Sequence, residues 1–406
     1  MSTNRYGRSK MMRKIRLGFI FFLLVFLFAG LPQAAADVFT QCPCPSGTPV
    51  NPATGNIECT LAGPRNIACK SLTAGDGYVK MADGSDMYVF GFNDVTGIAD
   101  NLIMATGARA ANFSAPTISI LQGQEFYLSL TNVGMAVRPD LFDPHTVHFH
   151  GFPQAASVFD GEPMASTAIS QGSTITYYYN LVAEGTHMYH CHVEATEHMQ
   201  MGMLGNLYVR SSQEGTLING FTKFAYTDTD GSTGYDVEYP IQIVSFDPAF
   251  HAADEGIQPL PFGDMKDTYP MLNGRGYPDT INPGNILNVD GNPSQKISSL
   301  ITATVGQRVL LRISSLATTD FFTLTIPGIP MTVVGKDARI LRTAAGANMF
   351  YTTNSVTLGG GESIDVILDT SGIAPGTYFL YTSNLNHLSN DAEDFGGMMT
   401  EIVITL

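Results

Sequence analysis

The sequence predicts an all-β protein made of two Greek-key β-sandwiches, preceded by a disulfide-stapled segment. Three observations support this fold class. Only 14% of the residues are charged, and 41 glycines separate many short runs of β-branched residues. A pattern of alternating strands occurs twice along the chain, which indicates an internal duplication. Four of the five cysteines lie close together near the beginning of the sequence.

Residues 1–36 have the layout of a secretory signal peptide. Basic residues including Arg13 precede an apolar run, Leu17–Leu31, and small residues precede Asp37. The run is shorter than the roughly 20 residues that span a bilayer, although an uncleaved membrane anchor remains the alternative. We therefore expect an exported protein, periplasmic or extracellular.

The mature chain is strongly acidic. Residues 1–36 carry six basic residues and no acidic ones, so their removal moves the formal net charge from −15 to −21. Such a charge repels nucleic acid and anionic membranes. We expect neither nucleic acid nor, after signal cleavage, a membrane as a partner.

The cysteines fall into two groups. Four lie near the mature N-terminus, and the fifth stands alone: Cys42, Cys44, Cys59, Cys69 and, apart from them, Cys191. In an oxidising compartment the first four predict two disulfides, in which Cys42 and Cys44 each pair with Cys59 or Cys69. The spacing leaves the connectivity open, and a four-cysteine zinc site is the competing interpretation.

The expected organisation has five parts. They are a signal peptide (1–36), a Cys-rich segment (37–75), a metal-binding domain (76–212), a linker (213–236) and a second domain without that site (237–406). Thr117–Asn132 alternates, turns at Gly123 and alternates again, which predicts two half-buried strands. Leu300–Ile313 repeats this pattern around Gly306. Two further pairs of segments correspond: Gly185–Tyr189 with Gly376–Tyr381, and Gly202–Met203 with Gly397–Met398.

Seven of the nine histidines lie between residues 145 and 203. Six of the seven belong to two motifs, His145-Thr-Val-His148-Phe-His150-Gly151 and His190-Cys191-His192, the second followed by His198 and Met203. Side chains alternate faces along a strand, so Cys191 faces away from its two neighbouring histidines. The alternation predicts two sites, one formed by His145, Cys191, His198 and Met203, the other by His148, His150, His190 and His192.

Two imidazoles, one thiolate and a weak thioether are the ligands of a blue, or type 1, copper centre. Met203 would be the long axial ligand. Zinc is the alternative for the same donors, but the methionine favours copper. We interpret His187 and the methionines at 188, 199 and 201 as packing residues.

The two motifs resemble the copper motifs of multicopper oxidases and, more loosely, those of copper nitrite reductases. The resemblance covers residues 78–406 and implies cupredoxin-like domains. It assigns His145, Cys191, His198 and Met203 to type 1 copper. It assigns the other four histidines to half of a type 2/type 3 cluster that reduces dioxygen.

The second domain departs from this pattern. Aligning the repeats places Leu324 and Ile326 opposite His148 and His150, and it places Thr382, Ser383 and Asn384 opposite His190, Cys191 and His192. Only His387 and His251 remain as candidate ligands. The resemblance implies a homotrimer in which His387 of a neighbouring subunit completes the catalytic site.

The sequence thus predicts an exported copper-dependent oxidoreductase of the multicopper oxidase type. Electrons would pass from type 1 copper to a second copper at a domain or subunit interface, and then to dioxygen or a small oxo-anion. The alternatives are an electron carrier with type 1 copper alone and a copper-binding surface protein without turnover. A small molecule, a metal ion or a redox protein would deliver electrons near His198, the expected exposed edge. Asp143 and Glu194 are candidate proton donors by nearness.

Overall fold

A computed structural model of the chain describes residues 39–152 and 155–406. The expected signal peptide, residues 1–36, lies outside the described residues. In the part of the chain that is described, no helix is long and apolar enough to cross a membrane.

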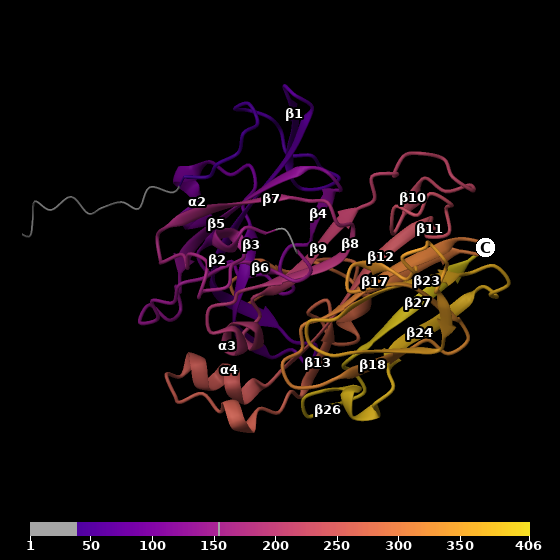
Figure 1. Cartoon of the computed structure of the whole chain (residues 1–406). Helices are drawn as coiled ribbons and strands as arrows, with labels where there is room; N and C mark the ends of the chain where they lie inside the picture. Colours follow the sequence, from indigo (N-terminus) through magenta and orange to yellow (C-terminus); the bar gives the residue numbers. More distant parts are fainter. Residues whose placement is uncertain (1–38, 153–154) are drawn as a thin grey trace, which may run out of the picture. The chain divides into compact units, whose positions relative to one another are not determined.

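The first sandwich consists of two sheets whose strands are indigo to magenta in Figure 1. One sheet has the order β1-β2-β5-β7, and β3 also pairs with β2. Its strands are β1 (Ile57–Leu61), β2 (Arg65–Lys80), β3 (Asp86–Asp94), β5 (Glu125–Gly134) and β7 (Thr174–Asn180). The other sheet has the order β4-β9-β8-β6. Its strands are β4 (Ile118–Leu121), β9 (Leu204–Arg210), β8 (Gly185–His190) and β6 (His148–Phe149). A core that includes Phe126, Leu128, Tyr177 and Cys191 lies between the sheets.

The second sandwich repeats this design with larger sheets. The first is ordered β13-β12-β17-β23-β19-β20, with β21 on β19. Its strands are β13 (Tyr269–Leu272), β12 (Val237–Phe246), β17 (Arg308–Ser315), β23 (Ser363–Asp369), β19 (Met331–Lys336), β20 (Arg339–Ile340) and β21 (Tyr351–Thr353). The second is ordered β16-β27-β24-β18-β22. Its strands are β16 (Ile301–Thr304), β27 (Met399–Thr405), β24 (Gly376–Thr382), β18 (Phe322–Thr325) and β22 (Ser355–Leu358).

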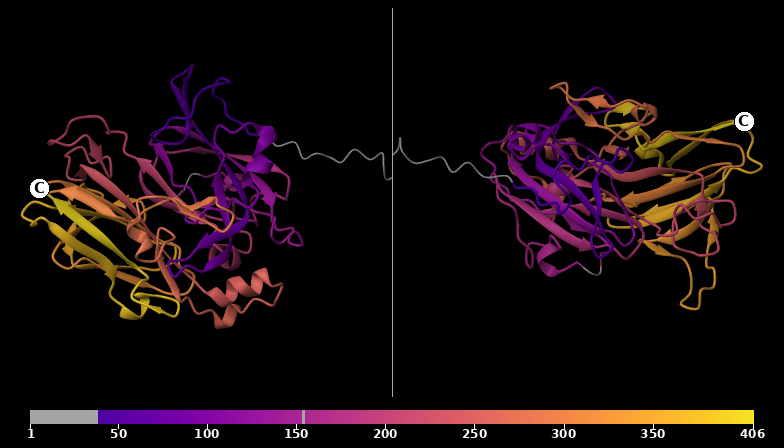
Figure 2. Two further views of the ribbon diagram at one scale, coloured as in Figure 1. Left: turned by 180° about the vertical axis from the view of Figure 1, so that it is seen from behind. Right: turned by 90° about the horizontal axis from the view of Figure 1, so that it is seen from above.

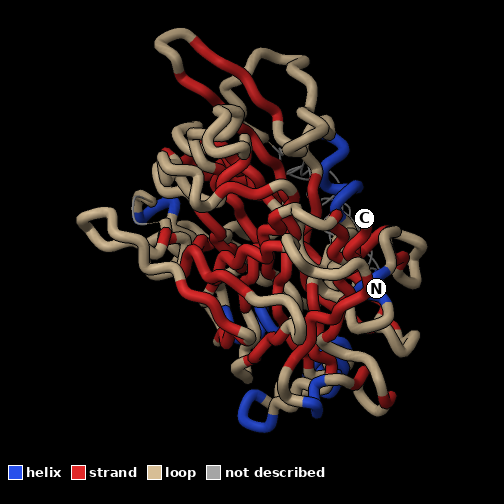
Figure 3. Tube along the Cα trace, turned by 90° about the vertical axis from the view of Figure 1, so that its right-hand side faces the viewer, coloured by secondary structure: helices blue, strands red, loops and turns tan. Residues whose placement is uncertain are grey.

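Helices and small hairpins connect these strands, and Figure 3 shows how far strands outnumber helices. The helices are α2 (Asp100–Gly107), α3 (Ala195–Gln200), α4 (Pro248–Glu255) and the 3-10 turns η1 (Ser157–Phe159), η2 (Phe262–Asp264), η3 (Asp279–Ile281) and η4 (Leu385–His387). The two-stranded sheets are β10 (Lys223–Phe224) with β11 (Gly234–Tyr235), β14 (Ile286–Leu287) with β15 (Pro293–Gln295), and β25 (Ser389–Asn390) with β26 (Glu393–Asp394). The predicted all-β, cupredoxin-like fold class is confirmed.

The predicted repeat is visible in the hydrogen bonds of two turns. Gln124 N–H donates to the Leu121 carbonyl at 3.1 Å, and its side-chain oxygen accepts from Leu121 N–H. Gln307 makes the same pair of bonds with Thr304. In each turn the preceding glycine has a positive φ, 87° at Gly123, which favours glycine. The two turns fix a residue-by-residue correspondence between β5 and β17.

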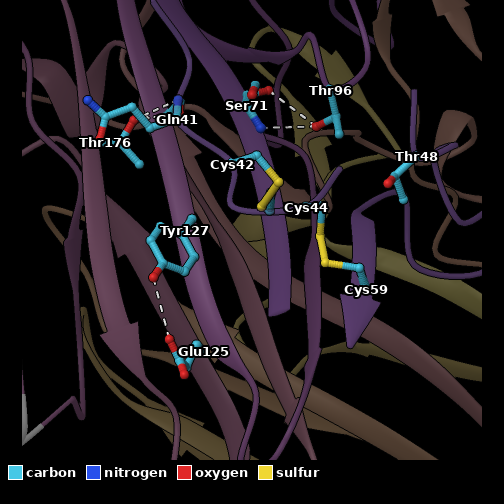
Figure 4. The surroundings of a disulfide bond; sticks show 12 residues. Gln41, Cys42, Cys44, Thr48, Cys59, Ser71, Thr96, Glu125, Tyr127 and Thr176 are labelled. Carbon is cyan, nitrogen blue, oxygen red and sulfur yellow. Dashed lines mark hydrogen bonds between the residues drawn. A yellow bond between two sulfur atoms is a disulfide. The ribbon is translucent and has the colours of Figure 1, made fainter. Parts of the chain in front are cut away.

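The N-terminal segment is more regular than its composition indicated. Two strands lie wholly or partly within the Cys-rich segment 37–75, since β1 begins at Ile57 and β2 at Arg65. The disulfides are Cys42–Cys69 and Cys44–Cys59, which resolves the connectivity and excludes a four-cysteine zinc site (Figure 4). Cys59 and Cys69 lie on β1 and β2, so sheet pairing orders a stretch that has little periodicity of its own.

The two sandwiches are joined by a polar, fully buried contact between β8–β9 and β12–β17–β23. Thr186 Oγ1 donates to Asp365 Oδ1 at 2.5 Å and accepts from Arg312 at 3.3 Å. Ser314 Oγ donates to Asn206 Oδ1 at 2.7 Å. Every residue of β8 is buried as a result. Both views in Figure 2 show the strands of the two halves next to each other.

The expected linker is part of this packed structure. Residues 213–236 contain β10 and β11, and Tyr226 and Tyr235 from this stretch are buried against Leu310 of β17. Its glycines and hydroxyl-bearing residues form turns around these buried tyrosines, so the stretch is not a free tether.

Candidate metal centre

The thiolate pocket lies inside the first sandwich. Cys191 directly follows β8, His198 is on α3 and His145 precedes β6. All three are fully buried, as is Met203 in front of β9. The Cys191 sulfur lies 3.2 Å from His198 Nδ1 and 3.8 Å from His145 Nδ1. The predicted thiolate and two imidazoles therefore converge.

Backbone hydrogen bonds hold Met203 beside this group. Cys191 N–H donates to the Met203 carbonyl at 3.1 Å, and Met203 N–H donates to the His198 carbonyl at 2.8 Å. Gly202 has a φ of 113°, and a Cβ atom there would lie 2.9 Å from the Phe90 carbonyl oxygen. The Gly-Met motif is thus explained by a tight turn that only glycine fits.

The electrostatics of the pocket favour a thiolate. Burial alone would raise the pKa of Cys191, but the charge of His198 and hydrogen bonds from both histidines lower it well below its usual value. Burial lowers the pKa of His198, yet the Cys191 thiolate and Asp143 raise it to about 10. The thiolate therefore requires a positive charge beside it, which a bound metal ion supplies.

The edge of this pocket differs from expectation. We expected His198 to be exposed, but it is fully buried because its ring packs edge-on against Phe90. Its Nε2 atom faces Asp143 Oδ2 at 3.8 Å. Asp143 therefore lies beside the thiolate pocket, whereas Glu194 is an exposed residue at the start of α3.

The four remaining histidines of the motifs form a second cluster at the edge of β6 and β8. His148 and His190 are directly paired in the antiparallel ladder. The ring of His148 lies 4.9 Å from that of His192 and 5.5 Å from that of His150, centre to centre. The four imidazoles therefore lie together in a group separate from the Cys191 sulfur.

The orientation of these rings leaves bare nitrogens facing one another. His150 Nδ1 lies 3.4 Å from the Gly361 carbonyl, and His190 Nδ1 lies 2.7 Å from the Cys191 carbonyl. If each Nδ1–H donates to its carbonyl, both Nε2 atoms carry lone pairs, and these atoms are 3.0 Å apart. Two facing lone pairs repel unless a cation lies between them. Burial lowers the pKa of His190 to about 3, which disfavours a proton there, so a metal ion fits.

The residues that orient the rings were not found from the sequence. His148 Nδ1 lies 2.6 Å from the Asp160 carbonyl, and the Asp160 carboxylate is 3.7 Å from the same nitrogen. Gly361, which orients His150, is 211 residues away in the sequence. His187 lies 3.1 Å from the carbonyls of both His150 and Ala183, so it is a packing residue, as predicted. Carbonyl contacts of this kind carry no local sequence signal.

Thr146 connects the two clusters. Its backbone N–H points at the Cys191 sulfur at 3.5 Å, and its side-chain oxygen accepts from His192 N–H at 3.1 Å. Cys191 is itself covalently joined to His190 and His192. The thiolate and the imidazole cluster are therefore separated by a few bonds of one rigid segment.

A cavity of about 880 Å³ opens beside the imidazole cluster. His148 and His150 line one side, and the other side belongs to the second sandwich, with Lys336, Arg339 and Gly361. A small molecule can therefore approach the imidazoles from this cavity.

The second sandwich contains a counterpart of the thiolate pocket without its ligands. Thr382 N–H donates to the Met398 carbonyl at 3.1 Å, and Met398 N–H donates to the His387 carbonyl at 3.0 Å. These bonds match those of Cys191, Met203 and His198. The rings of Phe322 and His387 are 4.8 Å apart, as those of His145 and His198 are 5.0 Å apart.

This correspondence corrects the alignment made from sequence by one residue. Cys191 is matched by Thr382 rather than Ser383, and Leu324 and Ile326 point into the core instead of matching histidines. Within its own chain, His387 belongs to the counterpart pocket, so a role in a shared site would need a second chain. His251 is buried, 2.6 Å from the Tyr88 carbonyl, and lies in neither cluster.

Comparisons with known proteins agree with this geometry. The chain is 23% identical over 274 residues to "Laccase-5" of Arabidopsis thaliana, which covers 64% of this chain and 39% of the relative. It is 32% identical over 124 residues to "L-ascorbate oxidase" of Brassica rapa subsp. pekinensis, covering 30% of this chain and 19% of the relative. The chain thus spans at most about two fifths of the length of these curated relatives.

Solved structures share the fold. The blue copper oxidase of Nitrosomonas europaea superposes with a TM-score of 0.61 at 23% identity, covering 82% of this chain and 85% of that one. The copper nitrite reductase of the same organism gives a TM-score of 0.54 at 16% identity, covering 82% and 93%. Two sequence models of the multicopper oxidase family match residues 106–214 and 180–403. The second match alone covers more than half of the sequence, and the chain belongs to the multicopper oxidase family, whose members bind copper.

Proposed function

We propose that the protein is an exported copper oxidase with a type 1 centre in the thiolate pocket and a second copper site in the imidazole cluster. Bound copper would supply one-electron chemistry at both sites, from an external reductant to dioxygen. The facing nitrogens of His150 and His190, 3.0 Å apart, are the observation that carries the second site.

Each group of residues has a distinct task. His145, Cys191, His198 and Met203 hold copper in a pocket that excludes water, since all four are fully buried. The carbonyls of Asp160, Cys191 and Gly361 fix the three neighbouring imidazoles with Nε2 free, as outer hydrogen bonds commonly do for metal-binding histidines. The cavity beside the cluster gives dioxygen or a small oxo-anion a way in.

Asp160 is better placed than Asp143 or Glu194 to handle protons at the second site. Its carboxylate is 3.7 Å from His148 Nδ1 and it lines the cavity. Asp143 lies instead beside His198, where electrons from a small molecule, a metal ion or a redox protein would enter.

Two features favour export. The N-terminal sequence has the layout of a signal peptide, and the structure contains two disulfides, which persist in oxidising compartments. Assembly as a homotrimer with His387 shared between subunits remains a prediction from the family resemblance.

A second candidate function is electron transfer with type 1 copper alone. The second sandwich favours it, because none of its described side chains joins the imidazole cluster. A copper-binding protein without turnover is the remaining alternative.

Copper content per chain separates these functions. For the oxidase we expect the His150→Ala protein to lose the second copper and its oxygen consumption while it keeps the blue colour. His387→Ala is the matched control: a loss of copper in that variant would establish sharing between subunits. One copper per chain in the unaltered protein, with the blue colour intact, would contradict the oxidase and leave a carrier.

A further inference from the structure

The outward face of the sheet that contains β5 and β7 is covered by the chain's own N-terminal segment. Gln41 N–H lies 3.3 Å from Ser129 Oγ and 3.3 Å from Thr176 Oγ1. The next residue, Cys42, forms a disulfide with Cys69 on the adjacent strand β2 (Figure 4). Residues 41–42 thus contact three neighbouring strands, β2, β5 and β7, and we call residues 39–48 the cap.

The same three positions exist in the second sandwich. The turns at Gln124 and Gln307 set the correspondence, so Ser129 matches Arg312. Ser129 pairs with Thr176 in the antiparallel ladder, and Arg312 pairs with Asp365 in the same way. Thr176 therefore matches Asp365. On the parallel neighbour, Cys69 pairs with Tyr127 as Glu238 pairs with Leu310. Cys69 therefore matches Glu238.

In the second sandwich these positions form the contact with the first. Arg312 and Asp365 both bind Thr186 of β8, and Glu238 forms a salt bridge with Arg210 of β9. The cap therefore occupies, on the first sandwich, the place that β8 and β9 occupy on the second. It covers a face that the fold uses elsewhere to join one sandwich to the next.

The complementary face of the second sandwich is open. The strands β8 and β9 are buried on both sides, except for the half-buried last residue of β9. On the corresponding side of their counterparts, Thr377 and Phe379 of β24 are exposed, Phe379 by 41%, and the outward residues of β27 are half-buried. Thr377 matches Thr186, because Gly376 pairs with Ile404 at the start of β24 as Gly185 pairs with Val209 at the start of β8.

We propose that the cap, held by the Cys42–Cys69 disulfide, blocks head-to-tail association in which the open face of a second copy docks on β5 and β7. The occupant is a second copy of this chain because the open and capped faces repeat the two faces that already join the sandwiches. Such a contact is heterologous, so uncapped chains would form closed rings or open filaments. A trimer of the oxidised chain has to form through other faces.

The test compares the mass of the protein in solution by light scattering. Cys42→Ser/Cys69→Ser is expected to shift the mass to higher multiples of one chain. Cys44→Ser/Cys59→Ser, which keeps the cap tied to β2, is the matched control and should leave the mass of the oxidised protein unchanged. An unchanged mass in the first variant, with the blue colour retained as evidence of folding, overturns the proposal.

Two further variants test the geometry. Thr176→Cys and Thr377→Cys, added together to the uncapped protein, should crosslink copies head to tail when treated with oxidised glutathione, because their counterparts Asp365 and Thr186 are short side chains whose oxygens are 2.5 Å apart. Phe379→Asp in the otherwise unaltered oxidised protein should leave its mass unchanged. A fall in mass would show that the open face is already occupied with the cap in place, which overturns the proposal even if the uncapped protein does not fold.

Discussion

The thiolate pocket of the first sandwich and its counterpart in the second share one backbone and differ in chemistry. Both keep a methionine and a histidine, with one backbone hydrogen bond from the methionine N–H to the histidine carbonyl and one from Cys191 or Thr382 N–H to the methionine carbonyl. Phe322 and Thr382 replace His145 and Cys191, and the second pocket remains packed around Leu324 and Met398. The backbone arrangement is therefore stable without the ligands, and two side chains decide whether a blue copper centre can form.

The largest effect is expected from removing the thiolate. Cys191→Ser should abolish the blue absorption completely, because the colour requires charge transfer from sulfur to copper. Thr382→Ser makes the matched change in the counterpart pocket and should leave the spectrum unaltered. The comparison fails if the Cys191→Ser protein is still blue after copper loading, as read by visible absorption.

The converse experiment adds the missing ligands. Phe322→His with Thr382→Cys should create a second, weaker blue centre, since His387 and Met398 already hold the matching places. Copper content should rise in step with the absorption. Phe322→His alone is the control, and an unchanged spectrum in the double variant would mean that more than two side chains separate the pockets.

A smaller effect concerns the stability of the metal-free protein. Burial lowers the pKa of His190 to about 3 in the folded state. As the pH falls, His190 is therefore protonated in the unfolded chain before it is protonated in the folded one. The contribution of neutral His190 is complete above its unfolded pKa, near 6.5, and is lost as the pH falls towards 3. At about 1.4 kcal/mol per pKa unit, this amounts to a few kcal/mol.

Urea unfolding of the metal-free protein at several pH values measures this loss. His190→Gln should flatten the dependence between pH 6.5 and 3, and His387→Gln, in the less buried pocket of the second sandwich, should flatten it less. If the free energy of unfolding varied equally with pH in the two variants, the imidazole cluster would not be the dominant source of the loss of stability at low pH.

The smallest effect is expected at Asp143. Its carboxylate lies 3.8 Å from His198, and removing a carboxylate behind a metal-binding histidine typically weakens metal affinity by about 10- to 100-fold; the long distance places Asp143 at the low end of this range. Asp143→Asn should therefore lower the affinity of the blue site by about 10-fold, measured by competition with a chelator. Asp320→Asn is the control, because Asp320 is 4.0 Å from His387 in the counterpart pocket.

Strand periodicity was sufficient to predict the fold class and the repeat, and it placed the candidate metal-binding side chains in two groups. These features depend on alternation within a strand, which the sequence carries directly. The predicted alignment of the second sandwich is wrong by one residue, because Leu324 and Ile326 are core residues and do not stand at the histidine positions. The orienting carbonyl of Gly361 and the regular strands around Cys59 and Cys69 depend on contacts between distant segments, and nothing local indicates them.

Gly361 belongs to the second sandwich, and its carbonyl helps to orient His150 in the imidazole cluster. A Cβ atom at this position would lie 3.0 Å from His150 Cε1, so the loop touches the ring it orients. The thiolate pocket lies wholly within the first sandwich, so under the proposed function it can take up copper before the second sandwich has folded. In the imidazole cluster, His150 is oriented by the Gly361 carbonyl only after the second sandwich has folded against it.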